Sequence, residues 1–226
     1  MSIEQYQGRL PATWLWFTDC RHGGVALDAS ATTGQVAAEL APWFGEVHVL
    51  REREADFAGV RALAAALHDA PYREAVGTIH SAPFPEGSFD CVAVHDVLAG
   101  RSPASEDTAR TLARIRALLR PGGWLAAASP RRGLRRSGAR GVSPRAFTRA
   151  LERAGFRDTR CLFAAPSIDR PLSLVPDSAP TVRAYEGSDP IAGTTSPGRR
   201  VLSWLGAGAL LYPGYFILAR TPAART

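Results

Sequence analysis

The chain has 226 residues, of which 27 are basic and 21 acidic, so its formal net charge at pH 7 is +6. Hydrophobic residues make up 46% and charged residues 21%, an ordinary balance that excludes a wholly disordered chain. Every basic residue is an arginine, and this bias, beside abundant alanine, glycine and proline, indicates codon usage more than a binding face. We therefore expect no nucleic-acid partner. The length suits one α/β domain with embellishments, or at most two small domains, and is ample to bury a core.

The cysteines indicate neither a disulfide framework nor a metal site. Cys20, Cys91 and Cys161 are far apart, odd in number and outside any Cys-x-x-Cys or His/Cys cluster. We expect free thiols, no bound metal and a reducing, cytoplasmic location. The N-terminus also lacks the pattern of a signal peptide, because Glu4 stands where basic residues belong.

In the first half of the chain, short apolar runs alternate with helical patterns. The first run ends in Asp28, and the helical stripe at 36–44 that follows it is closed by Gly45. A second helical stripe covers residues 57–67. The strands that we predict here cover residues 25–28, 47–50, 76–79 and 89–94.

The second half continues this alternation. A stripe at 112–119 predicts a helix that Pro121 and two glycines end, and Ser143 is a good N-cap for a helix that Gly155 ends. The strands predicted here cover residues 124–128, 161–165 and 215–219. The alternation predicts a mostly parallel sheet with helices on both faces.

Two segments near the C-terminus interrupt the pattern. Residues 166–200 contain six prolines and little periodicity, so we predict an irregular insertion: a lid, a binding loop, or simply a mobile connection. Residues 201–219 are uncharged and almost long enough to cross a membrane, but glycines and Pro213 divide them into a helix, a turn and a strand. We expect no membrane partner. The division predicted is an N-terminal extension at 1–23 and one domain at 24–226.

Three motifs adjoin predicted strands: one contains the first strand and the turn after it, one leads into the fourth strand, and one precedes the fifth. They are Val-Ala-Leu-Asp-Ala-Ser-Ala-Thr-Thr-Gly at 25–34, Ala-Pro-Phe-Pro-Glu-Gly-Ser-Phe-Asp at 82–90 and Leu-Arg-Pro-Gly-Gly-Trp-Leu at 119–125. Together they resemble the motifs of small, type 11 class I S-adenosylmethionine-dependent methyltransferases, over roughly residues 24–163 plus the closing strand. The resemblance implies a three-layer, Rossmann-like methyltransferase fold. Its mostly parallel, seven-stranded sheet would carry the cofactor across the carboxyl ends of the first strands.

The resemblance also implies S-adenosylmethionine as the cofactor. The cofactor-binding positions that it implies are Asp28, Ala29, Ser30, Gly34, Arg51, Glu52, Thr78 and Ile79. The family turn reads acid-x-Gly-x-Gly-x-Gly, because the backbone must approach the cofactor closely. Here Asp28 and Gly34 remain, but Ser30 and Thr32 stand where the first two glycines belong.

Two further positions depart from the family pattern. Arg51 holds the place of the acid that takes both ribose hydroxyls, with Glu52 one residue later. A guanidinium group cannot accept a hydroxyl proton. Thr78 holds the place of the acid that meets the adenine amino group. These departures keep the expected fold but weaken the expected reaction.

The candidate catalytic residues are His95 and Asp96, which follow the fourth predicted strand. A histidine there could act as general base for an oxygen or nitrogen nucleophile, and the alternative is that both residues only cap the strand. His80 is a weaker candidate on the same edge. A cluster of arginines after the fifth strand would either grip an anionic group or form a solvated loop. Its members are Arg131, Arg132, Arg135, Arg136 and Arg140.

Three functions stay open at this point. The first is a methyltransferase acting on a small molecule or a peptide, with an atypical cofactor turn. The second is a catalytically inactive relative that serves as a scaffold or as the regulatory protein partner of another enzyme. The third is an enzyme that uses the fold for a different, anionic ligand. Fold-level analogy alone does not choose among them.

Overall fold

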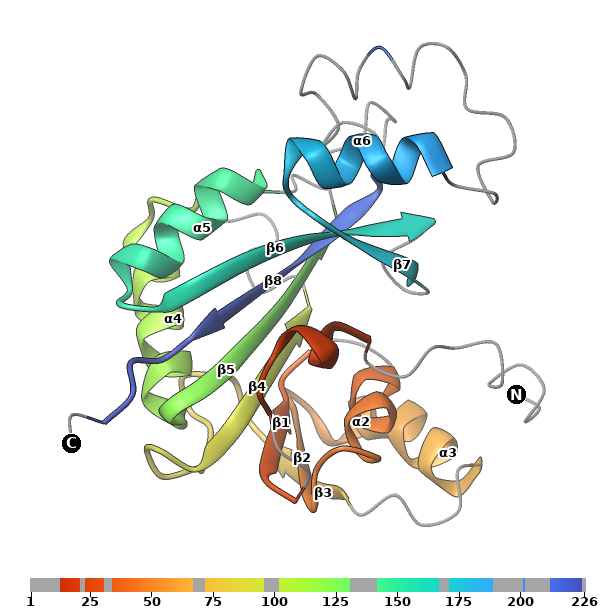
Figure 1. Ribbon diagram of the computed structural model, residues 1–226. Coiled ribbons are helices and arrows are strands. Elements are labelled where there is room, and N and C mark those ends of the chain that lie inside the picture. Colours follow the sequence, from red (N-terminus) through yellow and green to blue (C-terminus); the bar gives the residue numbers. More distant parts are fainter. Residues whose placement is uncertain are drawn as a thin grey trace.

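A single eight-stranded sheet forms the centre of the protein (Figure 1). The computed structural model describes residues 13–20, 23–30, 34–66, 72–95, 102–130, 142–166, 171–188, 201 and 212–224. The strands lie in the order β3-β2-β1-β4-β5-β8-β6-β7. They are β1 (Val25–Asp28), β2 (Glu46–Arg51), β3 (Tyr72–Val76), β4 (Phe89–His95), β5 (Leu119–Pro130), β6 (Arg157–Pro166), β7 (Pro171–Pro176) and β8 (Gly214–Arg220).

The direction of the strands brings several chain segments to one edge of the sheet. Strands β1 to β5 are mutually parallel, whereas β8 runs antiparallel between β5 and β6, and β7 is antiparallel to β6. The loops that follow β1, β2 and β3 therefore leave the sheet on the same side. The strand order reverses between β1 and β4, and ligands of open α/β sheets bind beside such a switch point.

Helices cover both faces of the sheet, as Figure 1 shows. Apolar side chains of α4, α5 and α6 join one core cluster, and those of η1, α2, η2 and α3 join the other. Along the central strands, Ala26 and Leu27 belong to opposite clusters, as do Trp124 and Leu125. The predicted three-layer α/β fold is confirmed. The helices are η1 (Thr13–Phe17), α2 (Gln35–Leu40), η2 (Glu54–Phe57), α3 (Ala58–Ala66), α4 (Glu106–Leu118), α5 (Pro144–Arg153) and α6 (Ala179–Ser188).

The number of strands corrects the sequence prediction, because the sheet has eight strands and not seven. The additional strand is β7, which lies with α6 inside the Pro-rich segment at 166–200 that we predicted to be irregular. Pro171 and Pro176 stand at the two ends of β7, on the edge of the sheet, where a missing N–H is tolerated. Ser178 caps α6 by accepting a hydrogen bond from the Thr181 amide at 3.2 Å.

The third strand also lies earlier than predicted, at Tyr72–Val76 instead of 76–79. It is the edge strand beside β2, and most of its side chains are exposed, so it carries little apolar signal. Gly77 ends it with a φ of 154°. Consequently Thr78 and Ile79 belong to the loop after the strand.

Some predicted features lie outside the described residues, namely Asp96, the arginine cluster at 131–140 and nearly all of the helix expected at 201–212. Among the residues that are described, no helix has the length and apolar character needed to cross a membrane. The N-terminal segment contributes Trp14 and Leu15 to the core cluster beside α2 and α3.

The helix cap predicted at Ser143 can be tested by stability. Its hydroxyl accepts a hydrogen bond from the Ala146 amide at 3.3 Å. We expect Ser143→Ala to lower the free energy of unfolding by about 1 kcal/mol, because an amide of the first turn loses its acceptor. Urea unfolding measures the change. Thr148→Ala, within the same helix, is the control, and an equal loss in both variants would contradict a capping role.

Candidate functional site

A cavity of about 590 Å³ opens beside the carboxyl ends of strands β1, β2 and β3. Six of the eight predicted cofactor-binding positions lie in its described wall, and the two that do not are Asp28 and Gly34. Its described lining residues are Ala29, Ser30, Leu50, Arg51, Glu52, Arg53, Ala55, Asp56, Gly59, Gly77, Thr78 and Ile79, with Asp28 directly behind them. The volume lies within the usual range of small-molecule sites.

A buried ion pair between Asp28 and Arg51 joins the ends of β1 and β2. Arg51 Nη2 lies 2.9 Å from Asp28 Oδ2, and the two side chains are 4% and 0% exposed. Arg51 Nη1 also donates to the backbone carbonyls of Leu50 at 2.8 Å and of Asp28 at 3.2 Å. The guanidinium is therefore held against the protein on several sides, although it contributes to the cavity wall.

The second oxygen of the Asp28 carboxylate holds the turn that follows β1. Oδ1 accepts a hydrogen bond from the Ser30 amide at 2.9 Å and a second from the Ser30 hydroxyl. Ser30 is itself only 1% exposed. Both oxygens of this carboxylate are thus engaged by the chain's own groups, as a buried charge requires.

Gly34 is the residue of the turn that the packing makes indispensable. Its φ is 89°, and a Cβ built on it would lie 2.6 Å from the Cα of Val60 in α3. The chain therefore enters α2 in a left-handed conformation and directly against a neighbouring backbone, which only glycine allows. Thr32, the other notable residue of the turn, lies outside the described residues.

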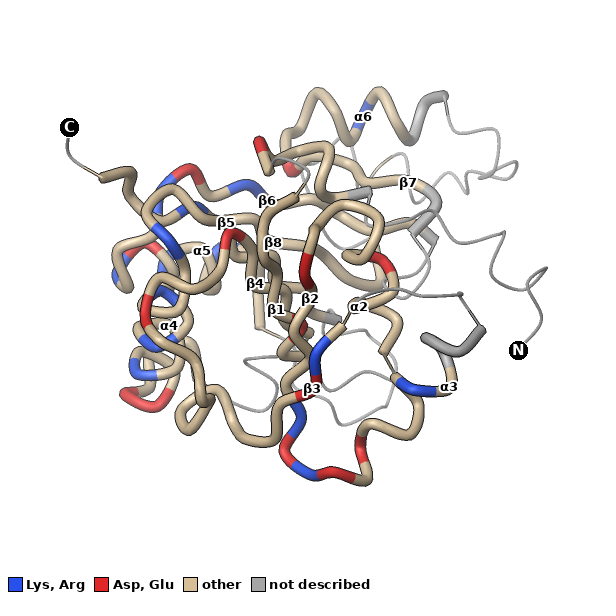
Figure 2. The backbone as a smooth tube through the Cα atoms, turned by 90° about the horizontal axis from the view of Figure 1, so that it is seen from below, with Lys and Arg blue, Asp and Glu red and all other residues tan. Residues whose placement is uncertain are grey.

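The loop after β2 carries alternating charges, which Figure 2 shows as a run of blue and red. Glu52 is exposed at the cavity. Arg53 pairs with Asp56 at 2.8 Å, and its hydrogen bond holds the pKa of that carboxyl below its usual value. The spacing Arg-Glu-Arg-Glu-Ala-Asp could have suggested this pair, but Asp56 was not among the predicted site residues.

The loop after β3 is a compact turn. Gly77 donates its amide to the Arg51 carbonyl at 2.8 Å, which ties β3 to β2 at the cavity. The Thr78 hydroxyl lies 3.1 Å from the Ser81 hydroxyl and accepts from the Ser81 amide at 3.2 Å. Ile79 is half-buried beside them. Thr78 therefore offers the cavity a hydroxyl already used within the turn.

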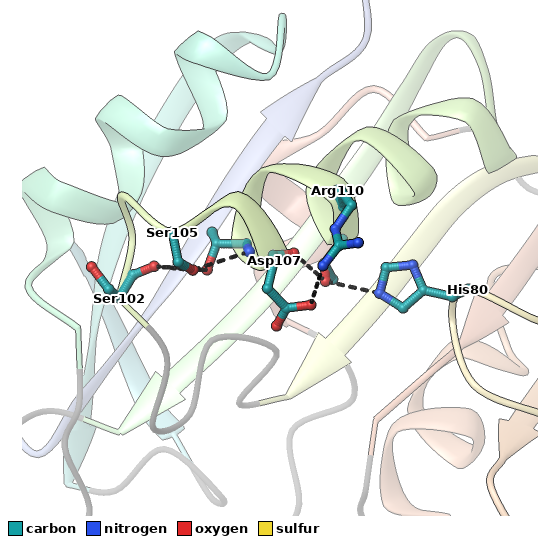
Figure 3. Close-up of polar contacts among 7 residues, drawn as sticks. His80, Ser102, Ser105, Asp107 and Arg110 are labelled. Carbon is teal, nitrogen blue, oxygen red and sulfur yellow. Dashed lines mark hydrogen bonds and ion pairs between the residues drawn. The ribbon is translucent and has the colours of Figure 1, made fainter.

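His80 faces α4, as Figure 3 shows. Its Nε2 lies 3.2 Å from the Thr111 hydroxyl, which donates to the Asp107 carbonyl at 2.9 Å. His95, the last residue of β4, is half-buried and lies edge-on to Phe216 with ring centroids 6.3 Å apart. Neither histidine is among the described residues that line the cavity.

The packing at Gly34 predicts a large loss of stability on substitution. Gly34→Ala should lower the free energy of unfolding by at least about 2 kcal/mol, from the left-handed backbone and the overlap with Val60. Gly87 has a φ of 67° but nothing within 4 Å of the place a Cβ would take, so Gly87→Ala isolates the backbone cost. Thermal unfolding of both variants gives the comparison. Equal losses would show that the contact with Val60 adds nothing.

The buried ion pair predicts that substitutions at Asp28 and Arg51 lower the free energy of unfolding strongly and that their effects do not add. Arg51→Met should cost about 3–5 kcal/mol, because it leaves the Asp28 carboxylate buried without a cation. The double variant Asp28→Asn with Arg51→Met should recover part of that loss. Urea unfolding of the set gives the coupling energy. Arg53→Met, which breaks the exposed pair with Asp56, should change stability little, and additivity of the buried pair would contradict the coupling.

Comparison with solved structures finds the same fold in proteins of low sequence identity. One is a Haemonchus contortus phosphoethanolamine N-methyltransferase in complex with phosphomonomethylethanolamine and S-adenosylhomocysteine (TM-score 0.60, 19% identity, 96% of this chain and 52% of that one). Others are the [4+2]-cyclase SpnF (0.61, 21%, 99% and 84%) and YcgJ of Bacillus subtilis (0.58, 14%, 97% and 100%). The chain thus spans about half the length of the Haemonchus enzyme.

The sequence comparisons agree with the fold. No curated protein sequence matches the chain. A family model described as a methyltransferase domain matches residues 27–127, which run from β1 through the cavity loops into β5. Together with the strand order, this match shows that the chain is similar to class I S-adenosylmethionine-dependent methyltransferases.

Proposed function

We propose that this protein is a non-catalytic member of the methyltransferase family, whose cavity no longer holds S-adenosylmethionine through its ribose. It would act through binding, as a scaffold or as the regulatory partner of another enzyme. The observation that carries the proposal is the buried pair of Asp28 and Arg51. The residues present do not fit the cofactor, and three features of the cavity, taken in turn, support this.

The first feature concerns the ribose. Its two hydroxyls need a hydrogen-bond acceptor, which the resemblance to the family assigns to an acid at the position of Arg51. A guanidinium has only donors. Arg51 cannot turn away to let another group replace it, because that would leave the Asp28 carboxylate buried and unpaired.

The second feature concerns the turn after β1. Where the family has a glycine, so that the backbone can approach the cofactor, Ser30 is buried and donates its hydroxyl to Asp28. Its side chain is thus part of the structure that holds the ion pair. A cofactor contact at this position would have to displace that hydrogen bond.

The third feature concerns the adenine. The resemblance assigns its amino group to an acid at the position of Thr78. The Thr78 hydroxyl is bonded within its own turn to Ser81, so the position offers no carboxylate but only a hydroxyl that already takes part in other hydrogen bonds. Three independent contacts to one ligand are therefore altered, and we derive no methyl-transfer step from this cavity.

An enzyme that captures an anionic ligand with Arg51 is supported less well. Asp28 already neutralises this guanidinium at 2.9 Å, so a bound anion would gain little net attraction from it. The [4+2]-cyclase SpnF shares the fold and is named for a reaction other than methyl transfer, which is consistent with loss of that reaction without loss of the fold.

A second candidate function rests on Glu52. This acid is exposed and lines the cavity, one residue after the position that the family uses for the ribose. If Glu52 accepts the ribose hydroxyls, the protein is a methyltransferase for a small molecule or a peptide. The cavity volume of about 590 Å³ is compatible with such a ligand.

Isothermal titration calorimetry with S-adenosylmethionine tests the proposal. Because the contacts to the ribose, the turn and the adenine are altered, we expect no saturable heat for the wild-type chain up to about 1 mM cofactor. A dissociation constant above about 1 mM corresponds to a binding free energy of less than about 4 kcal/mol. Binding in the micromolar range would overturn it. In that event Glu52→Gln should abolish binding if the second candidate is correct. Glu54→Gln, which does not alter a described lining residue, is the matched control.

A further inference from the structure

Two cysteines that are distant in the sequence have their thiols in contact. Cys20 follows η1 in the N-terminal segment, and Cys91 lies in the middle of β4. The two thiols are joined by a hydrogen bond, and Cys20 packs against the core cluster that contains Cys91. Cys-x-x-Cys spacing, the usual sequence signal for such a pair, is absent here.

The contact follows from how the N-terminal segment is anchored on the sheet. Asp19 accepts a hydrogen bond from the Trp124 indole at 2.6 Å and pairs with Arg220 at 2.9 Å. Trp124 is the direct neighbour of Cys91 in the pairing of β4 with β5, and both belong to the same core cluster. This anchoring places Cys20, the residue after Asp19, next to Cys91.

The two thiols differ in access and in acidity. Cys91 is fully buried, whereas Cys20 is half-buried. The hydrogen bond from Cys91 lowers the pKa of the Cys20 thiol, and the same bond together with burial raises the pKa of Cys91. Cys20 is therefore the thiol that ionises first, and the thiolate is the reactive form.

We propose that Cys20 and Cys91 are a redox-responsive pair that closes to a disulfide in the presence of a peroxide. The Cys20 thiolate attacks one peroxide oxygen, which breaks the O–O bond, gives the sulfenic acid and releases the other oxygen as water after protonation. The Cys91 sulfur then attacks the Cys20 sulfur, and a second water leaves as the S–S bond forms. Two thiols are oxidised and one peroxide is reduced.

Closure would have a definite consequence for the fold. All described residues that line the cavity, from Ala29 to Ile79, lie in the chain between Cys20 and Cys91. The disulfide would turn this part of the chain into a closed loop and fasten the N-terminal segment to the central strand β4. A closed loop of this size restricts the unfolded state strongly, so oxidation should stabilise the protein.

The experiment exposes the folded wild-type chain to hydrogen peroxide at equimolar to tenfold excess, blocks remaining thiols with iodoacetamide and maps peptides without reduction. We expect a Cys20–Cys91 cross-linked peptide, with Cys161 alkylated after unfolding. The melting temperature should rise by an amount on the order of 5 °C and return on reduction. Sulfinic acid at Cys20, or three alkylated thiols, would overturn the proposal.

Variants separate the pair from general oxidation. Cys20→Ser and Cys91→Ala should each abolish the rise in melting temperature, and the half-buried position of Cys20 makes the first variant compatible with folding. Cys161→Ser is the matched control, because Cys161 packs in the opposite core cluster and burial raises the pKa of its thiol. If Cys20→Ser still shows the rise on oxidation, the assignment is wrong.

Discussion

The ion pair between Asp28 and Arg51 is the constraint on which the candidate site depends. Two charges that are almost completely inaccessible to water are stable only when each neutralises the other and further hydrogen bonds support both. Asp28 therefore holds Ser30, and Arg51 holds the carbonyls at the ends of both strands. The cavity wall at β1 and β2 is a structural unit that cannot be altered at one residue without a cost at the others.

Much of the fold follows from the sequence because the central strands are buried on both faces. Apart from Asp28 and Asp90, the runs at residues 25–28 and 89–94 are apolar, and they are bounded by turns, so β1 and β4 lie where they were predicted. The edge strands β3 and β7 lack this signal. In β3 most side chains face water, and in β7 prolines at both ends resemble breaks in the chain although an edge strand tolerates them.

The sequence indicated part of the cavity lining but not the geometry of its side chains. Because parallel strands send their following loops to one edge, the positions after β1, β2 and β3 were expected to meet, and they line one cavity. The sequence pattern does not determine that Arg51 points back to Asp28, since that direction depends on burial and on which acceptors lie nearby. The contact of Cys20 with Cys91 escaped prediction for a similar reason, because the path of the N-terminal segment has no periodic signal.

The ion pair between Asp28 and Arg51 also changes what the net positive charge of the chain implies about its ligands. An arginine in a cavity wall would ordinarily attract anions, but the nearest carboxylate to Arg51 belongs to the protein itself. Arg53 is likewise paired with Asp56 at the rim. The described wall thus presents charges that are mostly balanced within it, and Glu52 is the exposed acid among them. Because these local charges largely cancel one another, the wall would attract anions less than the basic composition suggests. Selection of a ligand there would depend on shape and on hydrogen bonds to Glu52 and nearby backbone groups.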